Sequence, residues 1–168
     1  ISYSDASISN EGGFRPNEYV DAVFDPIEGA TVGWIATGEW LEDSIQVQEA
    51  GFYSLDFRYA SDNDNGGGPF HIELDGNAIS NPITVNTTGD WDNWATKTVN
   101  DIPLSLGDHI LKLSFSNGEF NLGRMIFTYS SPLNYDQPVA DAGENIVVVL
   151  PGSSATLNGT NSYDPGNN

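Results

Sequence analysis

The sequence predicts an all-β protein: an antiparallel β-sandwich of the jelly-roll type, followed by a linker and part of a second β-domain. Apolar and polar residues alternate with period two along most of the first 130 residues, and no window carries a helical apolar stripe. Glycine-rich and Asx-rich turns, such as the Asp-Asn-Gly-Gly-Gly run at 64–68, separate these segments at short intervals. Many short strands joined by frequent turns are typical of two packed antiparallel sheets.

The expected strands follow from this alternation. They cover residues 40–47, 51–60, 70–74, 94–99, 108–116 and 120–129. In the second of them, one face carries only apolar or aromatic side chains, namely Tyr53, Leu55, Phe57 and Tyr59. Polar side chains occupy the opposite face, so we expect these strands to be buried on one side.

The pattern changes after Tyr129, which divides the chain. Residues 131–138 are polar and proline-bounded, as in a linker. Residues 139–168 predict two strands around a turn, too few to bury a sheet face alone. We therefore expect a jelly-roll domain over 1–130, a linker over 131–138 and the truncated start of a second domain over 139–168.

Composition excludes several classes of partner. The chain of 168 residues has 24 acidic and five basic residues, a formal charge of −19. Nucleic acids and anionic membranes are bound through clustered Lys and Arg, so neither is expected as a partner. There is no cysteine for disulfides or thiolate metal sites. A neutral ligand meets no repulsion from such a surface.

Four tryptophans form two spaced pairs, Trp34 with Trp40 and Trp91 with Trp94. A ring on a glycine-bounded turn can stack on the apolar face of a sugar, while an amide such as Asn121 holds its hydroxyl groups. Trp34, Trp91 and Asn121 lie at expected turns or strand ends and are the candidate sugar-binding residues. Trp40 and Trp94 begin alternating runs, so we expect them to pack inward.

Catalysis has less support. A glycosidase needs two carboxylates roughly 5–10 Å apart, and no local motif singles out such a pair. His71 and His109 fall in expected strands rather than at a catalytic position. A catalytic β-sandwich, either a hydrolase or a lyase, and a structural spacer or adhesion module remain as alternatives to a binding module.

Calcium is the one candidate cofactor. Asp62 and Asp64 stand at alternate positions of a polar loop, as ligands do in calcium loops, and Glu18 with Asp21 forms a second acidic group. Solvated polar turns are the favoured interpretation of both groups.

In order along the chain, these motifs resemble carbohydrate-binding module family 6. The matching segments are Tyr3–Asp5, Asn10–Arg15, Tyr19–Asp21, Val32–Leu41, Gly51–Tyr53, Arg58–Ser61, Thr88–Trp94, Leu106–His109 and Phe120–Leu122. The resemblance implies a non-catalytic jelly roll, excised from a secreted glycoside hydrolase, that binds a polysaccharide or oligosaccharide. It also implies a monomer that is covalently linked to a catalytic domain in the parent protein.

The resemblance assigns roles to particular residues. Trp34 and Trp91 correspond to the two rings of the family's usual cleft and Asn121 to its asparagine. Trp40 and Glu73 correspond to a second cleft on the concave sheet face. Variants with these motifs accompany laminarinases and agarases, so the expected ligand is a β-1,3-glucan or an agar-type galactan, ahead of xylan or cellulose.

The chain departs from the family pattern in two places. The acidic first strand that helps to hold a structural calcium is missing because the sequence opens at Ile1. Gly123 and Arg124 follow Asn121-Leu where the family has an aspartate or asparagine and then a tryptophan. Both departures weaken the expectation of calcium. The tail, through Val139–Gly143 and Ser162–Pro165, resembles the start of a PKD-type (polycystic-kidney-disease) domain.

Overall fold

A computed structural model describes residues 2–133, 140–144, 154 and 156–162. The chain divides into two compact units, Ile1–Pro132 and Leu133–Asn168. The described residues form eleven strands, which lie in the first unit: β1 (Ser2–Ser4), β2 (Ala22–Asp25), β3 (Gly29–Val32), β4 (Trp40–Val47), β5 (Gly51–Ser61), β6 (Gly67–Leu74), β7 (Asn77–Ala78), β8 (Ile83–Val85), β9 (Asp90–Leu104), β10 (Gly107–Phe115) and β11 (Asn121–Pro132).

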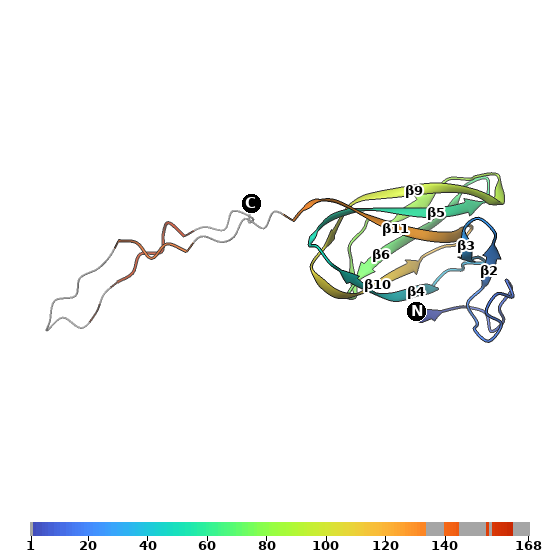
Figure 1. Ribbon diagram of the computed structural model, residues 1–168, viewed down its shortest axis with the longest axis horizontal. Coiled ribbons are helices and arrows are strands. Elements are labelled where there is room, and N and C mark those ends of the chain that lie inside the picture. Colours follow the sequence, from blue (N-terminus) through green and yellow to red (C-terminus); the bar gives the residue numbers. More distant parts are fainter. Residues whose placement is uncertain (1, 134–139, 145–153, 155, 163–168) are drawn as a thin grey trace. The chain divides into compact units, whose positions relative to one another are not determined.

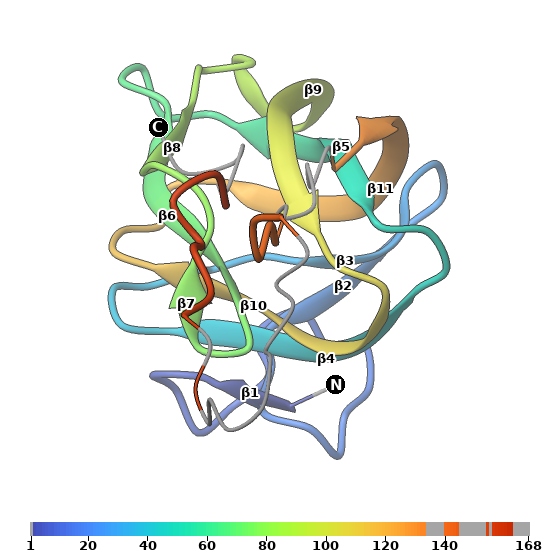
Figure 2. The same cartoon turned by 90° about the vertical axis from the view of Figure 1, so that its left-hand side faces the viewer.

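Two antiparallel sheets face each other in the first unit (Figures 1 and 2). One sheet has the order β1-β4-β10-β6-β7, with β8 also paired to β6, and the other has the order β2-β3-β11-β5-β9. Because neighbours in a sheet are rarely consecutive in the sequence, the chain crosses repeatedly between the layers. The described residues contain no helix, and so none that could cross a membrane. The predicted β-sandwich is confirmed.

The core follows from the alternation on the strands. Leu55 and Phe57 of β5 are completely buried, and on β10 the same period buries Leu111, Leu113 and Phe115. Phe70 stands at the centre of an aromatic cluster, with its ring 5.3 Å from that of Phe57 and 5.2 Å from that of Phe120. Aromatic pairs of this kind contribute about 0.5–1.5 kcal/mol beyond their buried area. The cluster joins the two sheets.

Two strands are longer than the sequence predicts because β5 offers a long partner. β9 pairs with β5 from Asp90 to Leu104, rather than over 94–99. β11 continues beyond Tyr129, so that Ser131 and Pro132 pair with β5, although composition assigned them to the linker. Proline is tolerated here because it ends the strand.

The second unit is described in part. Ser162 Oγ accepts a hydrogen bond from Asp141 N at 2.9 Å and donates one to Asp141 O at 3.0 Å. Asn158 N donates to Ala142 O at 3.3 Å, so segments 141–142 and 158–162 lie side by side. The two strands predicted over 139–168 fall largely outside the described residues. That domain assignment and the PKD-type resemblance stay predictions.

Candidate functional site

A cleft of about 630 Å³ lies where the loop after β3 meets the first residues of β9 and β11. Trp34, Trp91 and Asn121, distant in the sequence, all line it. The side chains of Trp34 and Trp91 are 56% and 39% exposed, as expected of rings that meet a ligand rather than fill a core. Phe120 of the aromatic core cluster forms part of the wall, so the cleft rests on the rigid interior.

The backbone around Trp34 holds its ring outward. Trp34 has a φ of 48°, a left-handed conformation that is uncommon for a bulky residue and persists only where the surroundings fix it. The carboxylate of buried Glu39 supplies much of that restraint, because it accepts hydrogen bonds from Ala36 N at 2.8 Å and from Ala6 N at 2.9 Å. A methyl group on Gly118 would lie 1.6 Å from Ile35 O, so this loop packs directly against the one before β11.

Asn121 is tied to Trp91. Its Nδ2 donates to Trp91 O at 3.0 Å, which fixes the amide plane and leaves Oδ1 free of protein donors among the described residues. Gly33 makes room for this arrangement, since a methyl group there would come within 2.9 Å of Asn121 Oδ1. The absence of a side chain at Gly33 therefore leaves the space that the Asn121 amide occupies.

Ser61, fully buried at the end of β5, joins the turn before Trp91 to the loop before Asn121. Its amide donates to Thr88 Oγ1 at 2.9 Å, and its hydroxyl donates to Glu119 O at 2.7 Å. Asn93 Nδ2 donates to Thr88 O at 2.6 Å and closes the turn from the other side. These bonds set the position of Trp91 relative to Asn121.

Trp94 lines the same cleft, so its prediction as a core residue is wrong. Its side chain is half-buried, and Nε1 donates to Asp25 Oδ2 at 3.2 Å. Backbone hydrogen bonds from Glu28 and Ile27, with this indole bond, lower the pKa of Asp25 despite its partial desolvation. Alternation contained the signal: Trp94 shares a face with exposed Thr96, whereas Ala95 packs on the core.

Trp40 and Glu73 lie on the outer face of the other sheet, linked through β10. Lys112 Nζ stands 4.9 Å from the centroid of the Trp40 ring and 4.0 Å from Glu73 Oε2. Ser114, which pairs with Trp40, donates a short hydrogen bond to Glu73 Oε1. That bond, with Lys112 and His71 nearby, lowers the pKa of Glu73. The predicted pair is thus brought together, but Lys112 lies over the ring that a sugar would use.

The four candidate calcium ligands do not form one group. Glu18 is paired with Arg15 at 3.6 Å, and Asp62 and Asp64 are exposed in the loop after β5. Asp21 is buried, which raises its pKa, and its Oδ1 accepts from Glu11 N at 2.6 Å. Within the described ranges, no three His, Cys, Asp or Glu side chains are placed to hold a metal. Binding of a calcium ion stays a prediction.

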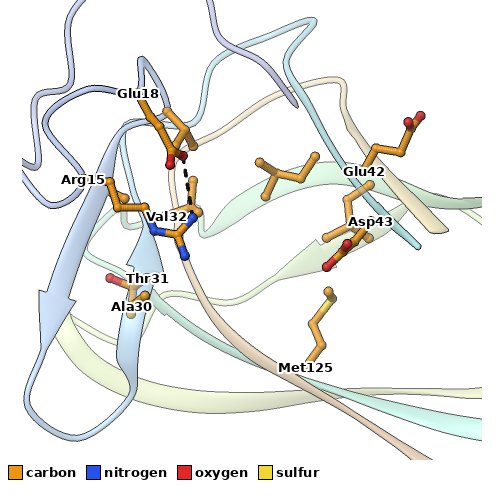
Figure 3. Close-up of a pocket in the computed structure, with 12 residues that line it drawn as sticks. Arg15, Glu18, Ala30, Thr31, Val32, Glu42, Asp43 and Met125 are labelled. Atoms are coloured by element: carbon orange, nitrogen blue, oxygen red, sulfur yellow. Dashed lines mark ion pairs between the residues drawn. The ribbon is translucent and has the colours of Figure 1, made fainter. Parts of the chain in front are cut away.

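A second hollow, of about 190 Å³, opens between the sheets near the Arg15–Glu18 ion pair (Figure 3). Its walls are mainly aliphatic, with Met125 and Asp43 at the mouth. It contains no aromatic ring for stacking on a sugar, so it does not compete with the tryptophan cleft as the site.

Ser105, His109 and Asp75 have the connectivity of a hydrolase triad but not its chemistry. His109 Nδ1 is 2.7 Å from Asp75 Oδ2, and Nε2 is 3.2 Å from Ser105 Oγ. Nε2 also lies 3.0 Å from the carbonyl oxygen of Ser105, and the hydrogen bond to Asp75 raises the pKa of His109. A ring that donates from both nitrogens has no lone pair for the Ser105 proton. The three residues form a structural clasp, by which we mean that His109 links the turn after β6, at Asp75, to the turn before β10, at Ser105, through hydrogen bonds.

The sandwich fold, taken together with the family match over most of it, identifies a carbohydrate-binding module. Residues 8–129 match the family described as carbohydrate binding module (family 6), and the chain belongs to that family. Modules of this family are non-catalytic, so the chain is not an enzyme.

Two solved structures illustrate the relationship. The C-terminal family 6 module of LamC, a marine laminarinase from Zobellia galactanivorans, is 29% identical with a TM-score of 0.59, over 65% of this chain and 87% of that one. A module of lichenase 5A from Cellvibrio mixtus, solved with cellotriose, is 28% identical with a TM-score of 0.57, over 66% and 86%.

A longer protein contains a related segment. A cycloisomaltooligosaccharide glucanotransferase from Niallia circulans is 26% identical over 110 residues, which cover 66% of this chain. The chain matches 10% of the length of that relative.

Proposed function

We propose that this module attaches a secreted polysaccharide-degrading enzyme to a neutral glucan or galactan, with β-1,3-glucan or an agar-type galactan favoured over xylan or cellulose. The observation that carries the proposal is the meeting of two exposed indole rings and one fixed amide in a single cleft. The rings would stack on a sugar, and Asn121 Oδ1 would accept from its hydroxyl groups.

The ligand class rests on the charge and on the relatives. Asp25, Asp92 and Glu119 line the cleft, which disfavours an anionic chain. The LamC module belongs to a laminarinase, and the lichenase module was solved with cellotriose. Both relatives are consistent with a neutral β-glucan, and the galactan rests on the sequence motifs. Attachment to an enzyme is supported by the segment of the glucanotransferase that this chain resembles.

Affinity electrophoresis on laminarin, agarose and xylan gels tests the proposal. We expect wild-type protein to be retarded on laminarin or agarose, and we expect both Trp34→Ala and Trp91→Ala to abolish the retardation. Tyr19→Ala, which removes an exposed aromatic ring that does not line the cleft, is the matched control and should migrate like wild type. Unchanged retardation of both cleft variants would show that this cleft is not the site.

The alternative of a structural spacer predicts a different result. Buried rings would resist quenching by acrylamide, and no glycan would alter the tryptophan emission. The exposure of Trp34 and Trp91 favours the binding function.

A further inference from the structure

Arg124 occupies an unusual position in this acidic chain. The pairing of β11 with β5 is irregular between Leu122 and Met125, so Gly123 and Arg124 form a bulge. Bulges commonly redirect a side chain next to a functional site. The side chain of Arg124 is 56% exposed, and the described residues accept no hydrogen bond from it.

Buried Glu28 forms an ion pair with Arg124 but accepts no hydrogen bond from the N–H groups of Arg124. Glu28 Oε1 accepts from Arg58 Nε at 2.9 Å and Nη2 at 2.8 Å, and Arg58 Nη1 donates to Thr96 Oγ1 at 3.0 Å. Glu28 Oε2 is buried and accepts no hydrogen bond among the described residues, while Arg124 Nε lies 3.6 Å away from it. Arg58 is therefore engaged by the protein, whereas Arg124 is attracted to Glu28 but keeps its N–H groups for a ligand.

Arg124 does not line the cleft itself, but the bulge places it three residues beyond Asn121, which does. Because the bulge adds one residue, Arg124 takes the next outward position after Asn121, roughly 7 Å along the strand. Trp94 packs on Gly123, where an added methyl group would be 3.2 Å from the indole ring. Trp94, which lines the cleft together with Asn121, thus packs on the residue that precedes Arg124.

We propose that Trp94 and Arg124 form a second sugar subsite, which takes the residue next to the one held by Trp34, Trp91 and Asn121. The inference rests on the proposed function and extends it to a ligand of at least two sugar units. Trp94 provides a surface for the second ring, and Arg124 donates to its hydroxyl oxygens. The ligand is neutral, because three acidic residues, Asp25, Asp92 and Glu119, line the cleft and outnumber the guanidinium of Arg124.

The test compares ligand lengths. Wild type, Arg124→Ala and Arg124→Lys are titrated with glucose, laminaribiose, laminaritriose, cellobiose and cellotriose by calorimetry and by tryptophan fluorescence. Arg124→Ala should leave glucose affinity unchanged and weaken the di- and trisaccharides about tenfold, the effect of one lost hydrogen bond from a charged donor. Arg124→Lys should restore part of that loss.

Arg15→Ala is the matched control, because it removes an exposed arginine from the other hollow. It should bind every sugar like wild type. If Arg124→Ala weakens glucose and trisaccharides equally, or changes neither, the subsite is refuted while the proposed function stands. Tighter binding of a uronate-containing oligosaccharide than of its neutral counterpart refutes the neutral ligand. Failure of wild type to bind any of these sugars, together with no retardation on agarose, counts against the proposed function itself.

Discussion

Gly33 lies beneath the amide of Asn121, and its replacement by alanine separates the geometry of the cleft from the stability of the fold. The added methyl group would stand 2.9 Å from Asn121 Oδ1, closer than a carbon and a non-bonded oxygen normally approach. Gly33 is not among the residues with positive φ, so its backbone accepts an L side chain. The crowding is relieved by moving the end of one flexible side chain.

The magnitude follows from the bonds that depend on that amide. A shift of about half an ångström lengthens the 3.0 Å bond from Asn121 Nδ2 to Trp91 O and moves Oδ1 away from the ligand. The internal bond to Trp91 O affects stability, whereas the bond from Oδ1 to the ligand affects affinity. One such bond contributes about 1 kcal/mol, so the affinity should fall roughly fivefold. The folded state should lose little, because a compatible Gly→Ala change gains about 0.4–1 kcal/mol through the unfolded chain.

Calorimetric titration with laminaritriose, together with urea denaturation, measures the two effects separately. A double-mutant cycle with Asn121→Ala provides the control, since Gly33→Ala should weaken binding in wild type and have almost no effect once the amide is absent. Equal losses in both backgrounds, or a fall in stability as large as the fall in affinity, would refute the mechanism.

Two further predictions concern stability. Glu39→Ala removes the charged acceptor of Ala6 N and Ala36 N, and we expect roughly 2–4 kcal/mol less stability in urea denaturation, with Glu39→Gln partly restoring it; an unchanged midpoint would contradict the restraint. The hydrogen bond to Asp75 raises the pKa of His109, so its stabilisation is complete below the ordinary value of 6.5 and is lost as pH rises through the folded-state pKa. The hydrogen bond to His109 lowers the pKa of Asp75, whose contribution is complete above 3.8 and is lost as pH falls through its folded-state pKa. Melting temperatures of wild type should therefore exceed those of His109→Asn most between about pH 4 and 6.5, and a difference independent of pH would contradict the clasp.

The sequence predicted the sandwich and three cleft residues because both follow from local patterns. Strand alternation identifies the buried face of β5, and glycine-bounded turns present Trp34 and Trp91. Trp94 was misplaced because a tryptophan at the start of a strand was taken to face inward, although within the predicted strand 94–99 it shares a face with Thr96. The roles of Ser61, Glu39 and Gly33 depend on partners 27 or more residues distant or on a close approach between loops, which no local pattern specifies. The outward position of Arg124 depends on the bulge in β11, and a bulge follows from how two strands pair, which no local sequence pattern shows.

The three candidate sugar-binding residues of the cleft come from three segments, at positions 34, 91 and 121, and Phe120 beside Asn121 belongs to the aromatic core cluster. No stretch of chain shorter than the span from Trp34 to Asn121 contains the site. A module truncated before Asn121 would therefore lack the complete site, and retention on a glycan reports that β3, β9 and β11 of the five-stranded sheet have assembled. Conversely, a bound sugar contacts segments that are remote in sequence, so it stabilises the folded state. The folding equilibrium constant rises by the factor one plus the ratio of the sugar concentration to its dissociation constant.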